Sequence, residues 1–566
     1  MRLLKSAVGI CANSGAGSFR VSKPYIDSPL SVSPHRPNLP EAEELSTAYP
    51  ILLPDALSPN LLPNLRSIAR HPQEIWLTDE LLFQYQRCQR RAYLELYGNA
   101  EQRDPPSDYL AKLRQDSLTH QRHVLTDHPT QHRPKYARRD WLEGAAKTRA
   151  LMQQGVERIS EGVLLLELET GLKLVSCPNL LIKQPGLSNF GDWLYAPADI
   201  RLGKRPKMDY QIAVAFHTYV LAAVQGAWPE TAWLMLRQRG SYAVDLFNML
   251  PRMQEALQDC IQMLSEAREP EVFIAHSRCD LCQWSSYCYE IAQSSRHLSL
   301  LPGVTPSRYE QLKLLELTTV EVLATASPRQ LENLPGFGLP VAQRLIWQAQ
   351  AVLQNRAIAD STQTDQTDPA QHRLLSATEL PTAEIELYFD IEAAPEQNLI
   401  YLHGVLVVDR LAQTERFYPM LARSADQEQL VWEQFLELVW RYPTAPIFHF
   451  CPYEVQTVRR LGELYGVSLE LIERLIDRFV DLHERVTRVA ILPVESYALK
   501  PIARWLGFNW RDAEANGAQT IFWYAQWLET GNADFLAAIL RYNEDDCRAT
   551  YRVKDWLVEF CQSSEA

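Results

Sequence analysis

Residues 384–392 read EIELYFDIE, and this stretch decides how the C-terminal third of the chain folds. Its apolar run ends at an acidic pair, Asp390 and Glu392, and the run predicts a β-strand. A second apolar run over residues 399–409 predicts the neighbouring strand of a hairpin. Because side chains two residues apart on a strand face the same side, one metal ion can meet both carboxylates.

Two further acidic motifs follow this hairpin in the chain. Residues 446–450 (PIFHF) predict a third strand, and Glu454 lies at the start of the helix after it. A helix is predicted over residues 537–551, where Tyr542 and Asp546 are four residues apart and share a face. Asp545 points about 100° away around the same helix and is the weaker ligand candidate.

The ligand types indicate which metal such a site would hold. Carboxylate oxygens without cysteine favour magnesium or manganese. Two such ions roughly 4 Å apart would activate a water molecule and stabilise the leaving oxygen when a phosphodiester bond is hydrolysed. A tyrosine can orient that water without ionising. We therefore expect a catalytic group in which four acids bind metal and the tyrosine assists, namely Asp390, Glu392, Glu454, Asp546 and Tyr542.

In this order, the motifs resemble the DEDD exonuclease superfamily, the DnaQ-like branch of the ribonuclease H-like fold. Its third motif is His-x4-Asp or Tyr-x3-Asp, and Tyr542 and Asp546 match the tyrosine form, DEDDy. The domain is similar to the module joined to RecB-type nucleases in bacteria, a likeness that residues 492–500 (LPVESYALK) and 506–508 (LGF) strengthen. The family's second motif usually carries Asp where this chain has Glu454, so Asp481 is an additional or substitute ligand. The resemblance implies a 3′–5′ exonuclease.

Three cysteines lie within ten residues, in the spacing Cys279-x2-Cys282-x5-Cys288, and Cys88 lies about 190 residues upstream. Four thiolates can hold a structural zinc ion or an iron–sulfur cluster, and spacing alone does not separate the two. The ten cysteines of the chain are too sparse for a secreted disulfide scaffold, which favours a reducing, cytoplasmic setting.

Residues 77–94 resemble the start of RecB-type nuclease domains of the PD-(D/E)xK class, a restriction-endonuclease-like fold. In the iron–sulfur members of that class, one early cysteine joins three late ones with the spacing seen here. The resemblance therefore implies a [4Fe–4S] cluster held by Cys88, Cys279, Cys282 and Cys288, with Zn²⁺ as the alternative.

The same resemblance implies a degenerate nuclease site in this first domain. His120 fits the family's histidine, but Asn179 stands where Asp is expected, and Arg201 follows Asp199 where the family has Lys. The helix after them, around residues 213–217, has neither the Gln nor the Tyr of the family pattern. A neutral amide brings no charge to Mg²⁺, and arginine cannot serve as a general base near neutral pH. We expect a domain that binds nucleic acid, with phosphates held by basic residues such as Lys204 and Arg205, although these can equally be solvated surface charges.

A short helical region carries a weak internal repeat. Residues 301–304 (LPGV) and 334–338 (LPGFG) are 33 residues apart, and each precedes a helical pattern. The second resembles a helix–hairpin–helix motif, in which Gly336 and Gly338 allow a tight turn and the next helix's amides receive a phosphate. A plain αα-hairpin with a glycine turn explains the pattern equally well.

The 566 residues therefore predict a multidomain α/β chain. The net charge of −13 means that binding to nucleic acid needs local basic patches. No apolar segment is long enough to span a membrane, so we expect no membrane partner. The predicted divisions are a disordered extension over residues 1–70, a RecB-like nuclease-fold domain over 71–295, a helix–hairpin–helix region over 296–355, a linker over 356–380 and a ribonuclease H-like domain over 381–562.

Taken together, the sequence resembles the bacterial RecB-like nuclease family over most of residues 76–560. The resemblance implies a metal-dependent 3′–5′ exonuclease, with DNA preferred over RNA as substrate, and a role in DNA repair. Two other functions stay open. One is a non-catalytic scaffold that binds nucleic acid, and the other is a nuclease that works through the first-domain site.

Overall fold

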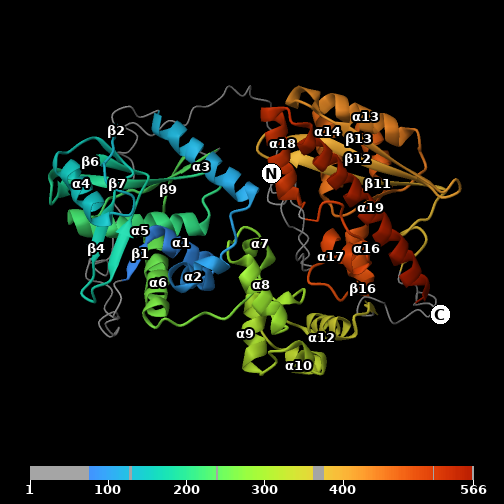
Figure 1. The fold of residues 1–566 in the computed structure, drawn as a ribbon, viewed down its shortest axis with the longest axis horizontal. Helices are drawn as coiled ribbons and strands as arrows, with labels where there is room; N and C mark the ends of the chain where they lie inside the picture. The colour runs from blue at the N-terminus through green and yellow to red at the C-terminus, as the bar shows by residue number, and fades with distance from the viewer. Residues whose placement is uncertain (1–74, 127–130, 238–239, 361–374, 514, 564–566) are drawn as a thin grey trace. The chain divides into compact units, whose positions relative to one another are not determined.

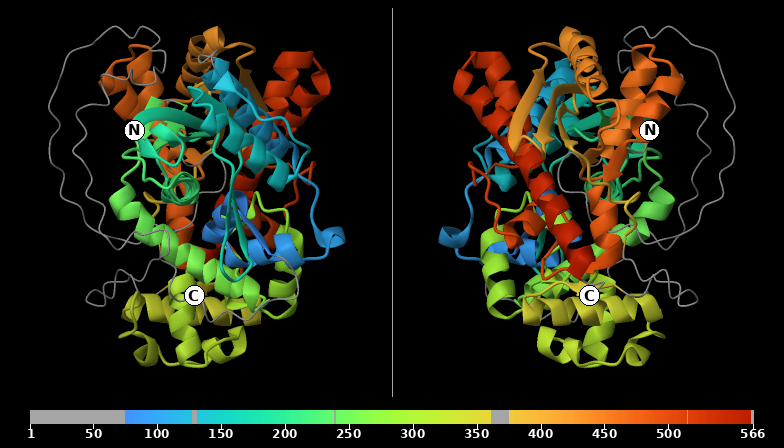
Figure 2. Two further views of the ribbon diagram at one scale, coloured as in Figure 1. Left: turned by 90° about the vertical axis from the view of Figure 1, so that its left-hand side faces the viewer. Right: turned by 90° about the vertical axis from the view of Figure 1, so that its right-hand side faces the viewer.

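The structure is a computed structural model, and it describes residues 75–126, 131–237, 240–360, 375–513 and 515–563. These residues divide into two compact units. The N-terminal unit comprises residues 75–272 and 281–287, and the C-terminal unit comprises residues 273–280 and 288–563. The predicted extension over residues 1–70 and most of the predicted linker lie outside the described residues. Figures 1 and 2 show the ribbon from three sides.

The N-terminal unit contains two β-sheets. One has three strands in the order β1-β5-β4, and the other has six in the order β2-β3-β6-β7-β8-β9. The strands are β1 (Trp76–Thr78), β2 (Gln131–His132), β3 (Arg158–Ser160), β4 (Leu164–Glu167), β5 (Lys173–Ser176), β6 (Leu180–Ser188), β7 (Gly191–Arg201), β8 (Trp233–Leu236) and β9 (Gly240–Ala243). The apolar runs of residues 163–193, broken by Gly and Pro, predict one antiparallel meander, and this prediction is wrong. β4 and β5 pair antiparallel, as do β6 and β7, but the two pairs belong to different sheets because β5 pairs in parallel with the distant β1.

Helices cover these sheets. They are α1 (Asp79–Arg87), α2 (Gln89–Tyr97), the short 3-10 helix η4 (Ala100–Gln102), α3 (Asp108–Thr126), α4 (Trp141–Gln153), α5 (Met208–Gln225) and α6 (Leu246–Ser265). The apolar stretch of residues 208–224 predicts a long buried helix, and α5 confirms it, with twelve of its residues buried. Apolar periodicity over residues 81–96 predicts a helical stretch, which forms two helices with Cys88 in extended conformation between them.

The cysteine-bearing stretch at the division between the units is also helical. It contains α7 (His276–Cys279) and α8 (Ser285–Ser294). None of the helices in the described ranges is long and apolar enough to cross a lipid bilayer.

The first part of the C-terminal unit is a small helical core. Its elements are η5 (Leu298–Leu300), α9 (Pro306–Leu314), α10 (Val320–Ala324), α11 (Pro328–Leu331) and α12 (Leu339–Gln354). The two glycine turns predicted from the repeat are related in space. Gly303 and Gly336 have φ angles of 87° and 81°, which glycine adopts without strain. The Arg308 guanidinium donates to the carbonyls of both, at 2.7 and 2.8 Å, and so ties the two turns together.

A five-stranded mixed sheet in the order β13-β12-β11-β14-β15 forms the centre of the C-terminal unit. Its strands are β11 (Ile385–Ala394), β12 (Leu399–Asp409), β13 (Thr414–Leu421), β14 (Ile447–His449) and β15 (Phe479–Asp481), and a separate antiparallel pair joins β10 (Ile358–Ala359) to β16 (Ala490–Ile491). β12 has the bounds that the sequence predicts. β11 runs past Asp390 and includes Glu392, so both acids lie on one strand. β10 falls within the first residues of the predicted linker.

The two faces of this sheet carry different side chains. Leu387, Phe389 and Ile391 of β11 belong to an apolar core that also contains Trp432 and Phe435 of α13. The alternate residues of β11 face helix α19, which contacts both β11 and β12. In Figure 1, α19 is the long red helix that crosses the sheet on the side away from α13. The remaining helices of the unit are η8 (Ala425–Gln427), α13 (Glu428–Trp440), α14 (Tyr453–Leu464), α15 (Leu469–Ile476), α16 (Leu482–Val489), α17 (Leu499–Trp505), α18 (Gly517–Thr530) and α19 (Ala533–Ser563).

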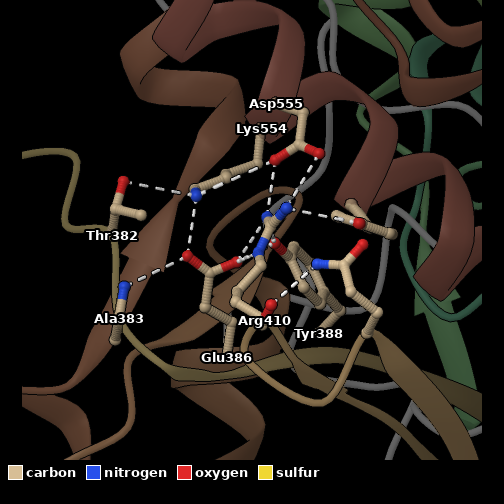
Figure 3. Close-up of polar contacts among 9 residues, drawn as sticks. Thr382, Ala383, Glu386, Tyr388, Arg410, Lys554 and Asp555 are labelled. Atoms are coloured by element: carbon tan, nitrogen blue, oxygen red, sulfur yellow. Dashed lines mark hydrogen bonds and ion pairs between the residues drawn. The ribbon is translucent and has the colours of Figure 1, made fainter.

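A buried ionic network joins α19 to β11 (Figure 3). The Lys554 ammonium lies 2.7 Å from the Glu386 carboxylate, and both side chains are almost fully buried. Arg410, just after β12, binds the other oxygen of Glu386 and also Asp555. The Tyr388 hydroxyl donates to Glu386 at 2.7 Å. Since every charge in the network has an opposite partner, the network fixes the position of α19 against the sheet.

Candidate metal centre

Three carboxylates meet on the α19 face of the C-terminal sheet. Asp390 and Glu392 come from β11, and Asp546 comes from α19. Each offers one oxygen, and these three oxygens lie within 4.8 Å of one another. Strand periodicity places the first two together, and packing of the helix brings the third.

The electrostatics of this cluster favour a bound cation. Burial raises the pKa of all three acids, and the negative charges of the neighbouring acids raise the pKa of Asp390 further, to well above its usual value. The pKa of Glu392 rises to about 8 and that of Asp546 to about 7. Three carboxylates held this close are stable in the charged form only with a compensating cation, and oxygen ligands suit Mg²⁺ or Mn²⁺. The donor set therefore fits a hard divalent ion.

Each carboxylate also accepts a hydrogen bond from a neutral side chain. Asn543 Nδ2 donates to Oδ2 of Asp390 at 2.6 Å. The Thr520 hydroxyl lies 2.8 Å from Oε2 of Glu392, and the Trp510 indole donates to Oδ1 of Asp546 at 2.7 Å. Each of these donors engages one named oxygen of its carboxylate. Such donors hold metal-binding carboxylates in one orientation.

Tyr542 lies one helical turn before Asp546 and is buried beside it. Its hydroxyl hydrogen-bonds to the Asp546 carboxylate. Burial raises the pKa of Tyr542 well above its usual value, so the hydroxyl remains a proton donor. The ammonium of Lys500, in the first turn of α17, lies 4.9 Å from the centre of the tyrosine ring, and its charge lowers the pKa values of Glu392 and Asp546.

Glu454 is near the three carboxylates but is not part of the group within 4.8 Å. It lies in the first turn of α14, and its charge raises the pKa of Asp390. Its Oε2 lies 3.4 Å from Nδ1 of His449, and this partner raises the pKa of the histidine.

The other two acids that the sequence offered have structural partners. Asp481 caps the N-terminus of α16, and its Oδ1 accepts hydrogen bonds from the backbone amides of Cys451, His483 and Glu484. Asp545 binds the Arg511 guanidinium and backbone amide.

The residues predicted for a first-domain site do not all come together. Asp199 and Arg201 on β7 form an ion pair of 2.6 Å, and Asn179 accepts a hydrogen bond from the Ile200 amide. Val124 of α3 packs against Ala198 and Ile200, which face the opposite side of β7 from Asp199. His120 also lies on α3. Burial lowers the pKa of His120, and the nearby positive charge of Arg237 lowers it further.

Sequence reasoning missed two neighbours of Asp199. Asp79, at the start of α1, lies close enough to His217, Asp199 and Arg201 for their charges to shift its pKa, which burial raises. His217 on α5 is fully buried and hydrogen-bonded through Nδ1 to the Ser176 hydroxyl, 2.8 Å away. The position of Asp79 directly after a strand was a usable signal, whereas nothing local marks His217.

The four predicted cluster cysteines belong to different units. Cys88 and Cys282 lie in the N-terminal unit, and Cys279 and Cys288 lie in the C-terminal unit. Within the N-terminal unit, burial raises the pKa of Cys282, and the nearby Cys88 thiol raises it further.

Comparison with known proteins supports the C-terminal site. Residues 387–558 match the family model of the RNase_H superfamily, and this range runs from β11 through the part of α19 that carries Tyr542 and Asp546. No curated protein matches the chain. A match to this superfamily suggests a nuclease, and hence a protein that binds nucleic acid. The acidic cluster therefore lies in a ribonuclease H-like domain, which occupies residues 387–558 of the C-terminal unit.

Proposed function

We propose that the C-terminal domain is a metal-dependent nuclease that shortens nucleic acid from its 3′ end, with DNA preferred over RNA. The observation that carries the proposal is the convergence of Asp390, Glu392 and Asp546 within 4.8 Å on one face of a ribonuclease H-like sheet. The DEDDy order of the motifs supports the exonuclease activity and its direction.

The side chains divide the chemistry among them. Two divalent ions at this site would supply an activated water and stabilise the charge on the leaving oxygen. Asp390, Glu392 and Asp546 would hold them, and Glu454 would contribute from the edge of the cluster after parting from His449. Tyr542, kept neutral by burial, orients the attacking water with the hydroxyl that now bonds Asp546.

The remaining parts of the chain would hold the substrate. In the N-terminal unit, Arg201 neutralises Asp199, which is the acid a nuclease site there would need. That unit would then bind phosphates, through Lys204 and Arg205, without cutting. The two turns that Arg308 ties together would act as a helix–hairpin–helix pair. The Phe337 and Gly338 amides donate to carbonyls within the second turn, so the first turn of α12 would receive the phosphate. No side chain caps α12, and because Pro340 has no amide N–H, the donors of this first turn would be the Leu339 and Val341 amides.

The cysteines Cys88, Cys279, Cys282 and Cys288 are proposed to hold a [4Fe–4S] cluster. Their spacing supports this, as does the effect of Cys88 on the pKa of Cys282. Protein purified without oxygen should be brown and hold about four iron atoms per chain. A colourless protein with one zinc ion per chain would replace the cluster with a structural zinc site.

The proposed activity is tested with end-labelled single-stranded DNA and RNA in the presence of Mn²⁺. The wild type should shorten a 5′-labelled DNA strand stepwise, and Asp390→Asn should abolish the shortening. Asp534→Asn is the matched control, because Asp534 is an exposed acid on the same helix as Asp546. If the label on 5′-labelled DNA were released as a single nucleotide, the enzyme would be degrading the strand from its 5′ end, and the proposed 3′–5′ direction would be wrong.

Two results would favour the other functions. Tight binding without cleavage of any substrate by the wild type would indicate a scaffold. Internal cuts that persist in Asp390→Asn and vanish in Asp199→Ala would move the activity to the N-terminal unit.

A further inference from the structure

Glycine at position 404 leaves the space that lets a helix side chain reach Asp390. Gly404 lies directly opposite Asp390 in the β11–β12 register. A methyl group on Gly404 would lie 1.6 Å from Oδ1 of Asn543, far closer than two non-bonded atoms can approach. The backbone of Gly404 does not have a positive φ, so glycine is needed here for space rather than for conformation.

The side chain that fills this space is buried at a free-energy cost. Asn543 on α19 is fully buried, and its Oδ1 has no hydrogen-bond partner among the described residues. A buried acceptor that loses its water partner and gains none in the protein is destabilising. Turning the amide over would not help, because Oδ1 would then face the Asp390 carboxylate, which is also an acceptor. Within the described ranges, the one polar contact that the amide makes is from Nδ2 to Oδ2 of Asp390, at 2.6 Å.

We infer that Asn543 is a positioning residue for Asp390, and that Gly404 is the residue that makes room for it. By holding Oδ2, the Asn543 amide would fix the rotation of the Asp390 carboxylate beside Glu392 and Asp546. Thr520 and Trp510 hold the other two carboxylates in the same way, which shows that the arrangement belongs to the site as a whole. The inference rests on the proposed function and deepens it, because it assigns a role in metal binding to two residues that are not ligands.

The first test replaces the amide with an apolar group of the same branching. Asn543→Leu keeps the number of side-chain heavy atoms and removes the donor, so Asp390 is freed to rotate, and a melting curve checks that the fold is retained. Titration of the metal-free full-length protein with Mn²⁺, followed calorimetrically, should give roughly 10–100-fold weaker binding than the wild type. On DNA, kcat should fall with KM little changed, since the substrate contacts are intact.

The second test uses the coupling between the two positions. Gly404→Ala should weaken Mn²⁺ binding as Asn543→Leu does, because the new methyl group displaces the amide. In an Asn543→Ala background the space is empty, so adding Gly404→Ala should change the Mn²⁺ affinity less than about twofold. Such non-additivity is expected only if the two residues act through one contact.

A control separates positioning from stability. Val553→Ala removes buried methyl groups from the same helix, away from the carboxylates, and should lower the melting temperature while leaving Mn²⁺ affinity unchanged. Wild-type Mn²⁺ affinity in Asn543→Leu and Asn543→Ala would overturn the inference, as would a weakening that Val553→Ala reproduces. A wild type that binds Mn²⁺ but cleaves nothing would overturn the proposed function alone, because the titrations still decide the role of Asn543. A wild type that binds no Mn²⁺ would overturn both.

Discussion

The Trp510 indole donates a hydrogen bond of 2.7 Å to the Asp546 carboxylate, and both side chains are buried. Trp510 comes from the loop between α17 and α18, whereas Asp546 lies in the middle of α19. A loop that carries no acidic ligand therefore sets the orientation of one.

Trp510→Phe keeps an aromatic ring in this position and removes the donor. We expect Mn²⁺ affinity to fall about tenfold, because Asp546 loses the bond that orients it. Calorimetric titration of the metal-free protein measures this. An unchanged affinity would mean that packing on α19 alone fixes the carboxylate.

Metal binding should strengthen as pH rises from 6 to 8. The metal-free pKa values of about 8 for Glu392 and about 7 for Asp546 lie above the ordinary values, so these groups hold protons at neutral pH that a metal ion must displace. Each displaced proton makes the affinity rise about tenfold per pH unit below the pKa. Because the pKa values of these acids are higher in the folded protein than in the unfolded chain, the folded metal-free protein is favoured at low pH. This contribution to stability is lost as pH rises toward 8. Melting curves with Mn²⁺ and with chelator, taken across this range, should diverge as pH rises.

His403 should make the C-terminal unit sensitive to acid. It lies among the rings of Phe389, Phe435 and Trp432, neither ring nitrogen has a partner among the described residues, and burial lowers its pKa to about 3. A histidine with a lowered pKa contributes stability above its unfolded pKa of about 6.5, and that stability is lost as pH falls toward 3. At pH 5.5 the loss is about 1 kcal/mol. His403→Leu should flatten the melting temperature between pH 7 and 5 relative to wild type, and parallel curves would contradict this.

The buried ion pair should be costly to break from one side. Lys554→Met leaves Glu386 buried with Arg410 as its remaining cation, and we expect a loss of roughly 3 kcal/mol in unfolding free energy. Glu386→Gln combined with Lys554→Met removes the buried charge as well and should recover part of that loss. Denaturant titration followed by circular dichroism measures both. Equal stability of the single and double variants would show that Arg410 compensates fully.

Arg308→Met tests the proposed role of the two glycine turns. Without the bonds to the Gly303 and Gly336 carbonyls the turns lose their shared support, and duplex DNA should bind about tenfold more weakly. Arg296→Met removes the same charge from an exposed pair with Glu321 and serves as the control. Equal weakening in the two variants would indicate a general charge effect rather than a contact made by the turns.

Local pattern was enough to predict much of the C-terminal domain. The apolar run of residues 399–409 gave β12 its bounds, and the two-residue spacing put Asp390 and Glu392 on one face. Four-residue spacing likewise placed Tyr542 beside Asp546. The prediction that residues 163–193 form one meander was wrong, because the partner that draws β5 into its own sheet lies almost a hundred residues earlier in the chain.

The orienting donors could not be predicted in the same way. Thr520 and Trp510 are neutral residues in stretches without periodic signal, and only tertiary packing brings them to the acids. Asn543 was the exception, since it lies three residues before Asp546 and so shares its helix face. Its contact with Asp390 could still not be predicted. Nothing in the sequence around Gly404 indicates that the glycine there makes room for an amide from another helix.

Helix α19 carries Asp546 near its middle and Lys554 eight residues later, about 12 Å along the axis. One helix therefore has two roles. Its middle brings Asp546 to the acidic cluster, and its C-terminal part is held against the sheet by the ion pair between Lys554 and Glu386. A chain that ended after residue 553 would keep every proposed ligand but lose Lys554. Without the ion pair to Glu386, α19 would no longer be held in the position that places Asp546 beside Asp390 and Glu392.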